Sequence, residues 1–309
     1  SSDLVRVFAG EIPAGWEQVA GYPLAPIPMQ FEAVRPCPGL RASYYPASTD
    51  GSALVFLGLQ GSTVKIFRFY PALNAWATES SPTNDSGVNI LALADGSLIS
   101  VNFSGVTRLK SPQGGSWVSL TSAPAVFDWR PALLELSNGR ILAISGHPTS
   151  GTGNGILEYD RDTDTWTPRV EGLGVAVQRP GVCELPSGKV LIADVGSGQY
   201  VLYDPSLGTL GTWGALPAIN GDLPYFVPAI VPTETGALVV LDTVQSYDEA
   251  TDSWTMLSDW APALSTTSRD TGGGALIDGD LYVVNSEGCV YRLKLTDYPI
   301  HTLRAARKL

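Results

Sequence analysis

Residues 132–166 read ALLELSNGRILAISGHPTSGTGNGILEYDRDTDTW, and this stretch decides the fold. It begins with an apolar run, a turn at Asn138-Gly139 and a second apolar run, a pattern that predicts a β-hairpin. A third apolar run ends at Tyr159-Asp160, and Trp166 follows after a short polar turn. The stretch therefore predicts a third strand that ends in Asp and a fourth strand whose aromatic side chain covers the unit.

The hairpin pattern recurs along the whole chain at nearly constant spacing. Asp-Gly and Asn-Gly between alternating apolar residues are a strong hairpin signal, because both turn residues then adopt positive φ. Consecutive turn glycines are 43–49 residues apart, which is the length of one four-stranded propeller blade. These glycines are Gly51, Gly96, Gly139, Gly188, Gly236 and Gly279.

The second half of the unit recurs as well. Tyr247-Asp248 followed by Trp254 repeats the end of the quoted stretch almost residue for residue. Weaker copies place Trp76, Trp117 and Trp213 after the third strands of their units. In the sixth unit, Tyr298 or Ile300 is expected to replace the tryptophan.

These repeats predict an all-β chain that forms a six-bladed β-propeller, with seven blades as the alternative. The propeller is expected over residues 40–309. Residues 1–39 are expected to form an N-terminal β arm, in which residues 4–8 and 16–19 resemble the third and fourth strands of a blade. These strands are expected either to complete an incomplete blade as closure strands or to form an appendage. The proline-rich segment 21–38 is expected to be an extended linker of polyproline character.

The Tyr-Asp ends with a following Trp, together with the glycine-turn hairpins, resemble kelch repeats and the central domain of galactose oxidase. The resemblance covers about residues 40–303 and is strongest in the units that end at Trp166 and Trp254. The Gly-Gly pair that closes the second strand in kelch repeats is missing; Ser145-Gly146-His147 stands at that place in one unit. The resemblance therefore implies a divergent kelch-like propeller.

Charge and composition exclude several partners. The formal net charge is −11 and the isoelectric point is about 4.6, which disfavours electrostatic binding to nucleic acid or to an anionic membrane. No run of 18 apolar residues occurs, so no membrane span is expected. The N-terminus does not have the pattern of a signal peptide, and we expect a location in a virion or in the cytoplasm.

Few residues of the types used in catalysis are present. Cys37, Cys183 and Cys289 are far apart in sequence and are expected to be free thiols, not a disulfide framework or a zinc site. The histidines are His147 and His301, for which we expect structural roles. Neither the copper ligands of galactose oxidase nor the turn motif of sialidases can be placed, and no spacing singles out a carboxylate pair for glycoside cleavage. We therefore expect no cofactor, no metal and no enzymatic activity.

The most suggestive polar set consists of arginines just before the first strands of the units. First strands line the channel of a propeller, so these guanidinium groups are expected to ring one mouth and to bind an anion or a carboxylate. The alternative is that each arginine binds loop carbonyls or a neighbouring acid. Aromatic side chains are expected on the same rim, as in protein interfaces and sugar-binding sites. The candidate binding residues are Arg41, Arg130, Arg179, Arg269, Trp129, Tyr225, Phe226 and Trp260.

The preferred function is a non-enzymatic structural or interaction propeller in a larger, homo-oligomeric assembly with protein partners, such as a phage tail or nozzle component of a virion. The scarcity of catalytic residue types, the divergent units, the acidic composition and the N-terminal arm favour this hypothesis. One alternative is a glycan-binding or glycan-modifying propeller that uses the arginine and aromatic rim. Another is a cytoplasmic kelch adaptor for protein partners.

Overall fold

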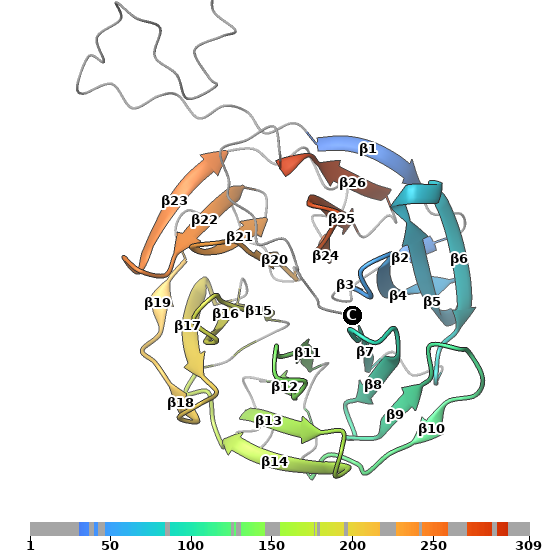
Figure 1. Ribbon diagram of the computed structural model, residues 1–309, viewed down its shortest axis with the longest axis horizontal. Helices are drawn as coiled ribbons and strands as arrows, with labels where there is room; N and C mark the ends of the chain where they lie inside the picture. The colour runs from blue at the N-terminus through green and yellow to red at the C-terminus, as the bar shows by residue number, and fades with distance from the viewer. Residues whose placement is uncertain are drawn as a thin grey trace, which may run out of the picture.

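The computed structural model describes residues 31–36, 40–42, 47–83, 87–124, 127, 131–145, 155–175, 177, 180–194, 197–216, 227–240, 243–258, 271–285 and 289–295. These residues form six antiparallel sheets that stand around a common axis (Figure 1). The molecule is a six-bladed β-propeller, as the spacing of the repeats predicts. In the described part of the chain, helical conformation is limited to the 3-10 turn Pro71–Leu73 and to Leu295.

The first three blades follow one another in chain order. Blade 1 contains β2 (Leu40–Ala42), β3 (Ser48–Thr49), β4 (Leu54–Gln60), β5 (Thr63–Tyr70) and β6 (Ala75–Ser80). Blade 2 contains β7 (Val88–Ala92), β8 (Leu98–Asn102), β9 (Thr107–Lys110) and β10 (Val118–Ser119). Blade 3 contains β11 (Ala132–Glu135), β12 (Ile141–Ser145), β13 (Gly155–Asp160) and β14 (Thr165–Val170).

The remaining blades complete the ring. Blade 4 contains β15 (Gly181–Glu184), β16 (Val190–Asp194), β17 (Gln199–Asp204), β18 (Thr209–Leu210) and β19 (Gly214–Ala215). Blade 5 contains β20 (Ala229–Pro232), β21 (Gly236–Val240), β22 (Val244–Asp248) and β23 (Ser253–Ser258). Blade 6 contains β24 (Thr271–Ile277), β25 (Asp280–Asn285), β26 (Cys289–Leu293) and β1 (Phe31–Pro36).

The fourth strand of blade 6 comes from the other end of the chain. β1 pairs antiparallel with β26, from Phe31 opposite Leu293 to Pro36 opposite Cys289. The Glu32 carboxylate accepts a hydrogen bond from Arg292 and lies 3.4 Å from the Lys294 amine. The expectation of a polyproline linker is therefore wrong for residues 31–36, because the unpaired edge of β26 provides a hydrogen-bonding partner that the local sequence does not reveal.

Outside blade 5, the hairpin turns form where the sequence predicts them, but most have a different geometry. At Gly96, Gly139 and Gly188 only the glycine has positive φ. The Gly96 amide donates to the Leu93 carbonyl, and the Leu93 amide donates to the Ser97 carbonyl. This is a three-residue loop with a glycine bulge, whereas two positive φ values were expected. Only at Asp278-Gly279, among these described turns, are both φ angles positive, at 53° and 86°.

The fifth hairpin turns one residue earlier than expected. Its loop is Glu234-Thr235, since the Thr233 amide donates to the Gly236 carbonyl and Gly236 is the first residue of β21. A Cβ atom at Gly236 would lie 2.0 Å from the Tyr247 carbonyl oxygen. Glycine is therefore needed here for close approach of two strands and not for a turn.

The third and fourth strands pair as the second half of the repeat predicts. Tyr159 is opposite Trp166 in blade 3, and Tyr247 is opposite Trp254 in blade 5. In blade 4 the partner of Tyr203 is Leu210. The expected Trp213 lies beyond β18, where its indole N–H donates to the Leu173 carbonyl of the preceding connection at 2.8 Å. Trp166 makes the corresponding bond to the Thr121 carbonyl at 3.0 Å.

The hydrophobic core consists of six clusters, and each cluster lies between two neighbouring blades. The cluster between blades 6 and 1, for example, packs Val284 and Tyr282 against Phe56 and Phe69. Because every sheet buries both faces against its neighbours, no blade has a core of its own. The ring is therefore the unit that is stable.

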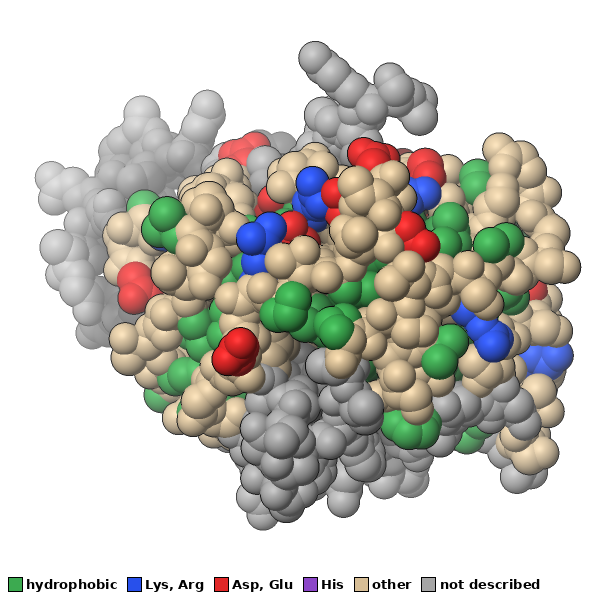
Figure 2. Space-filling model, turned by 90° about the horizontal axis from the view of Figure 1, so that it is seen from below, with side chains coloured by type: hydrophobic (Ala, Val, Ile, Leu, Met, Phe, Trp, Pro, Cys, Tyr) green, Lys and Arg blue, Asp and Glu red, His purple; other side chains and the backbone are tan. Residues whose placement is uncertain are grey.

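The two faces of the ring carry different connections. The turns between first and second strands, and those between third and fourth strands, emerge on one face, which we call the hairpin face. Turns between second and third strands and the connections from blade to blade emerge on the opposite face. Seen from the side, charged residues of both signs gather along the upper edge of the ring (Figure 2).

Candidate functional site

The binding residues expected from the sequence cannot be placed as a site. Arg41 belongs to the backbone of β2, and its side chain lies outside the described part of the structure. The other candidates lie outside the described residues altogether, as do His147, His301 and Cys37. They are Arg130, Arg179, Arg269, Trp129, Tyr225, Phe226 and Trp260. The arginine and aromatic rim stays a prediction.

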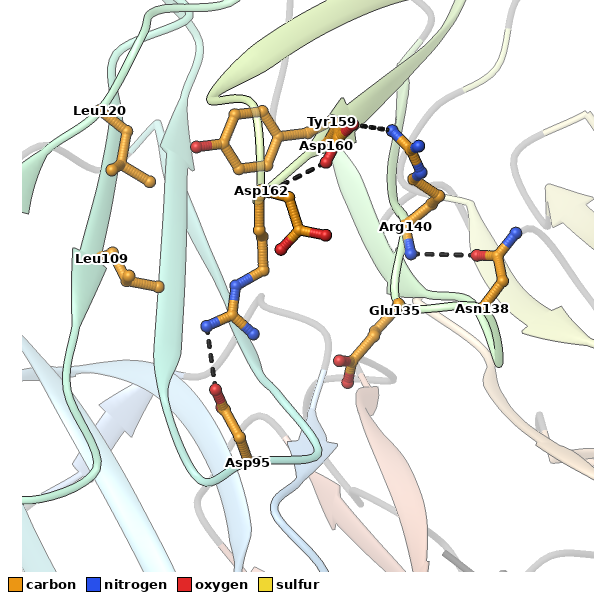
Figure 3. A pocket seen from close by; sticks show the side chains of 11 residues that line it. Asp95, Leu109, Leu120, Glu135, Asn138, Arg140, Tyr159, Asp160 and Asp162 are labelled. Atoms are coloured by element: carbon orange, nitrogen blue, oxygen red, sulfur yellow. Dashed lines mark hydrogen bonds and ion pairs between the residues drawn. The ribbon is translucent and has the colours of Figure 1, made fainter.

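Two neighbouring cavities open on the hairpin face. The first, of about 460 Å³, lies between blades 2 and 3, and its wall includes Leu109, Arg140 and Asp162 (Figure 3). The second, of about 580 Å³, lies between blades 1 and 2, and its wall includes Arg68 and Lys110. Asp95, at the tip of the β7–β8 hairpin, lines both. The hairpin tip therefore divides one polar groove into two chambers.

An ion pair crosses the first cavity from blade to blade. Arg161, in the turn after β13, donates to the Asp95 carboxylate of blade 2 at 2.9 Å. Within blade 3, Arg140 pairs with the Asp160 carboxylate, which also accepts the Asp162 amide at 2.9 Å. Asp160 thus closes the turn after β13 and holds a guanidinium group at the same time.

The second cavity is lined by a connected set of charges. Arg68 of β5 donates to the Asp50 carboxylate at 2.8 Å and to the Glu79 carboxylate at 2.9 Å. Lys110 of blade 2 pairs with the same Glu79 side chain. Blades 1 and 2 are therefore joined on the hairpin face by charges of alternating sign.

The carboxyl groups of both cavities have lowered pKa values. Burial alone would raise the pKa of Asp95, but hydrogen bonds from Ser97 and the Arg161 charge outweigh burial. Burial acts in the same direction on Asp50, where hydrogen bonds from Ser52 and Ala53 and the Arg68 charge lower the pKa instead. The pKa values of Glu79 and Asp160 are lowered in a similar way. These four groups are anions at neutral pH, so they suit binding and not proton donation.

Hydrogen bonds between blades fix the walls of the cavities. The Glu135 carboxylate at the end of β11 accepts the Ala94 amide of the preceding hairpin at 2.7 Å. Glu184 at the end of β15 binds the Ser137 amide in the same way, also at 2.7 Å. The Asp164 carboxylate accepts the amide and the hydroxyl of Thr121. Over blades 1 to 4, the hairpin face is thus held together by bonds between neighbouring blades.

The sequence contained a signal for these cavities that its repeat pattern concealed. The turns that identify the blades include Asp95, Asn138 and Asp160, and the repeat pattern explains these residues as turn residues only. The ring gives Asp95 a second role, because it brings Asp95 close to Arg161, which is 66 residues away. Charged residues at equivalent turn positions of consecutive units could have indicated a shared polar rim.

Outside the two cavities, the described residues include two cysteines. Cys183 is a buried free thiol, and burial raises its pKa; Cys289 is half-buried. Among the described residues, no three His, Cys, Asp or Glu side chains form a group that could hold a metal ion. A search of the same residues finds no helix with the length and apolar character needed to cross a membrane.

No protein-family model matches the chain, and no curated protein matches its sequence. Solved structures do resemble it. The structure of a streptogramin B lyase is 13% identical, with a TM-score of 0.58, and the match covers 86% of this chain and 97% of that one. A candidate gluconolactonase is 14% identical, with a TM-score of 0.61 and coverage of 89% and 94%. A catalytically inactive variant of virginiamycin B lyase from Staphylococcus aureus, with quinupristin, is 11% identical, with a TM-score of 0.57 and coverage of 86% and 99%.

Identities this low show the fold alone. The kelch relationship expected from the sequence is not confirmed, since no family model matches and the structures named above are lyases and a candidate gluconolactonase. By its sheets and by these similarities, the chain is a six-bladed β-propeller.

Proposed function

We propose that this chain is a non-enzymatic interaction propeller that presents its hairpin face to protein partners in a larger assembly. The observation that carries the proposal is the state of the charged groups on that face. The carboxylates of Asp50, Glu79, Asp95 and Asp160 are all held ionised by cations or backbone amides. A rigid pattern of fixed charges gives an interface its specificity and orientation.

A protein partner fits this surface better than nucleic acid does. The chain carries a net charge of −11, which would repel a polyanion. On the hairpin face, guanidinium and carboxylate groups alternate within a few ångströms of each other. A partner with the complementary alternation, and with a net positive charge, would be attracted at long range and oriented on contact.

A narrower form of the proposal is a structural component of a phage virion, such as a tail or nozzle protein. The acidic composition and the scarcity of histidine support it. A kelch-type cytoplasmic adaptor is the other form, supported by the Tyr-Asp and Trp repeats of blades 3 and 5. The two forms differ in oligomeric state, so the native mass of the protein from its source distinguishes a ring of many copies from a free adaptor.

The experiment is affinity capture from the source with two matched variants. Asp162 lies exposed on the hairpin face of blade 3, and Glu171 lies exposed at the opposite end of β14 in the same blade. We expect Asp162→Arg to lower partner recovery by about tenfold or more, as reversal of an interface charge should. Glu171→Arg should leave recovery unchanged. Loss of the partner with Glu171→Arg alone would place the interface on the opposite face.

An enzymatic outcome would overturn the proposal. Two of the similar structures are those of a streptogramin B lyase and of virginiamycin B lyase, the latter with quinupristin. The purified protein should therefore be incubated with quinupristin and with simple lactones. We expect no turnover above that of buffer. Turnover that disappears in His147→Ala, with the fold retained, would replace an interaction role with catalysis.

A further inference from the structure

The cavity between blades 2 and 3 has the size of a small-molecule site. Its volume is about 460 Å³, within the range of about 300–1,000 Å³ in which such sites fall. It belongs entirely to the hairpin face.

Its polar wall offers donors and acceptors side by side. Arg140 and Arg161 each make one ion pair, while a guanidinium group has five N–H donors. Asp162 has no ion pair among the described residues, and its carboxylate points into the cavity (Figure 3). Unused donors and unused acceptors therefore face the same space.

Charges of both signs limit the ligand that this wall can accept. A simple anion would be attracted by Arg140 but repelled by the Asp162 carboxylate. A simple cation would be attracted by Asp162 but repelled by Arg140. A hydroxyl group both donates and accepts a hydrogen bond, so neighbouring hydroxyl groups on one ligand can bind a guanidinium group and a carboxylate together.

The opposite wall is apolar. Leu109 and Leu120, contributed by blade 2, line the cavity across from Arg140 (Figure 3). Both leucines are partly buried against the core cluster between blades 2 and 3, so they form a fixed surface. A ligand with one hydroxyl-rich edge and one C–H face would match both walls at once.

The polar wall is ordered before any ligand arrives. The Asp95 carboxylate holds Arg161 at 2.9 Å, and the Ala94 amide holds Glu135 at 2.7 Å. The Asp160 carboxylate holds Arg140 in the same way, so binding would cost little side-chain entropy at that residue.

We propose that this cavity binds a neutral saccharide unit, with its hydroxyl groups on Arg140 and Asp162 and its C–H face on Leu109 and Leu120. The site lies within the hairpin face, so Asp162 would contact the saccharide in one complex and the protein partner in the other. It would give the propeller a second, carbohydrate-recognising role.

The test is ligand-observed NMR with the full chain and neutral methyl glycosides of glucose, galactose, mannose and N-acetylglucosamine. We expect at least one to bind with a dissociation constant of about 1–10 mM, the range of a few hydrogen bonds. Arg140→Ala and Asp162→Ala should each weaken binding by about tenfold. Glu171→Ala, in the same blade but on the opposite face, should not. Melting temperatures confirm that each variant folds. If Arg140→Ala does not fold, Arg140→Lys replaces it in the binding measurement.

Two charged probes decide between ligand classes. Glucuronate and the methyl ester of N-acetyl-lysine should bind more weakly than the best neutral glycoside. Binding of the lysine derivative alone would overturn the proposal and would indicate a pocket for basic side chains of a partner. Absence of binding by every neutral glycoside at about 20 mM, or equal binding to Arg140→Ala and Asp162→Ala, would also overturn it.

Discussion

The Tyr159 hydroxyl donates a 2.6 Å hydrogen bond to the Asp164 carboxylate, five residues further along the chain. Asp164 has a left-handed φ of 52°, which turns its side chain back toward the strand that it has just left. The same carboxylate accepts the amide and the hydroxyl of Thr121, in the connection that enters blade 3. One side chain thus closes a turn, satisfies a buried phenol and fastens two blades.

The equivalent Tyr–Asp hydrogen bond forms in blade 5 but not in blade 4. The Tyr247 hydroxyl donates to Asp252 at 2.8 Å, and Asp252 also accepts Tyr200 from blade 4. In blade 4 the equivalent of the aspartate is Gly208, which keeps the positive φ at 64° but has no side chain. Among the residues that the structure describes, the buried Tyr203 hydroxyl accordingly has no hydrogen-bond partner.

Removal of the phenol hydroxyl should therefore have opposite effects in two blades. Tyr159→Phe breaks a bond to a charged acceptor, and we expect the melting temperature to fall by about 2–6 °C. Tyr203→Phe removes a buried hydroxyl that has no partner in the described part of the chain, and we expect the melting temperature to stay the same or to rise. Calorimetry of the two variants checks this, and equal losses would contradict the role assigned to Asp164.

Restoring the missing aspartate should stabilise blade 4. A Cβ atom at position 208 would come no closer than 4.0 Å to its nearest neighbour, the Arg169 carbonyl oxygen. We expect Gly208→Asp to bind the Tyr203 hydroxyl, with a coupling of about 1 kcal/mol in a double-mutant cycle with Tyr203→Phe. Gly208→Ala is the control and should only destabilise, because alanine tolerates positive φ poorly. A coupling of zero would count against the comparison of blades.

Stability should fall on both sides of a broad pH plateau. The pKa values of Asp50, Glu79 and Asp95 are lower in the folded than in the unfolded chain, so their stabilisation is present above about pH 4 and is lost as the pH falls through the folded values. Burial and the Asp252 carboxylate raise the pKa of Tyr247, so its stabilisation is lost as the pH rises above about 10.

Melting curves from pH 2.5 to pH 11 measure both limits. Glu79→Gln should make the melting temperature less sensitive to acid, by on the order of a few degrees. Glu171→Gln, an exposed carboxylate with no ion pair among the described residues, should leave the acid limb unchanged. An acid limb that is identical for both variants would show that the charges around Arg68 do not couple to folding.

The closing strand should be needed for a stable ring. A chain that begins at residue 31 retains β1, whereas a chain that begins at residue 37 leaves the edge of β26 unpaired. We expect the shorter chain to melt at least about 10 °C lower and to associate, because it exposes an open sheet edge. Similar melting of the two chains would mean that pairing of β1 with β26 contributes little.

The parts of the fold that could be predicted are those encoded locally. A glycine turn between apolar runs predicts a hairpin, and a Tyr-Asp pair before a tryptophan predicts a third and a fourth strand. Both motifs predict the strands of blade 3 correctly. β1 could not be predicted in the same way, because its partner lies about 260 residues away and neighbouring prolines give its sequence the appearance of a linker. Gly236 was misplaced because a glycine needed for strand contact looks like a turn glycine.

The candidate site was harder to predict than the fold. Asp95 and Arg161 come from different blades, and nothing local indicates that they meet. Their contact can be predicted only when the number of blades and the relative positions of neighbouring blades are known. The eight residues that were predicted as a site lie outside the described part of the chain or, for Arg41, have no described side chain, so that prediction stays open.

The most direct measurement of the central claim is an electron-microscopy map of the protein purified from its natural source. We predict additional density against the hairpin face, covering the turns that carry Asp95 and Asp162, with all six blades in place. A single free ring with that face bare, from a preparation that retains its native partners, would contradict an interaction role.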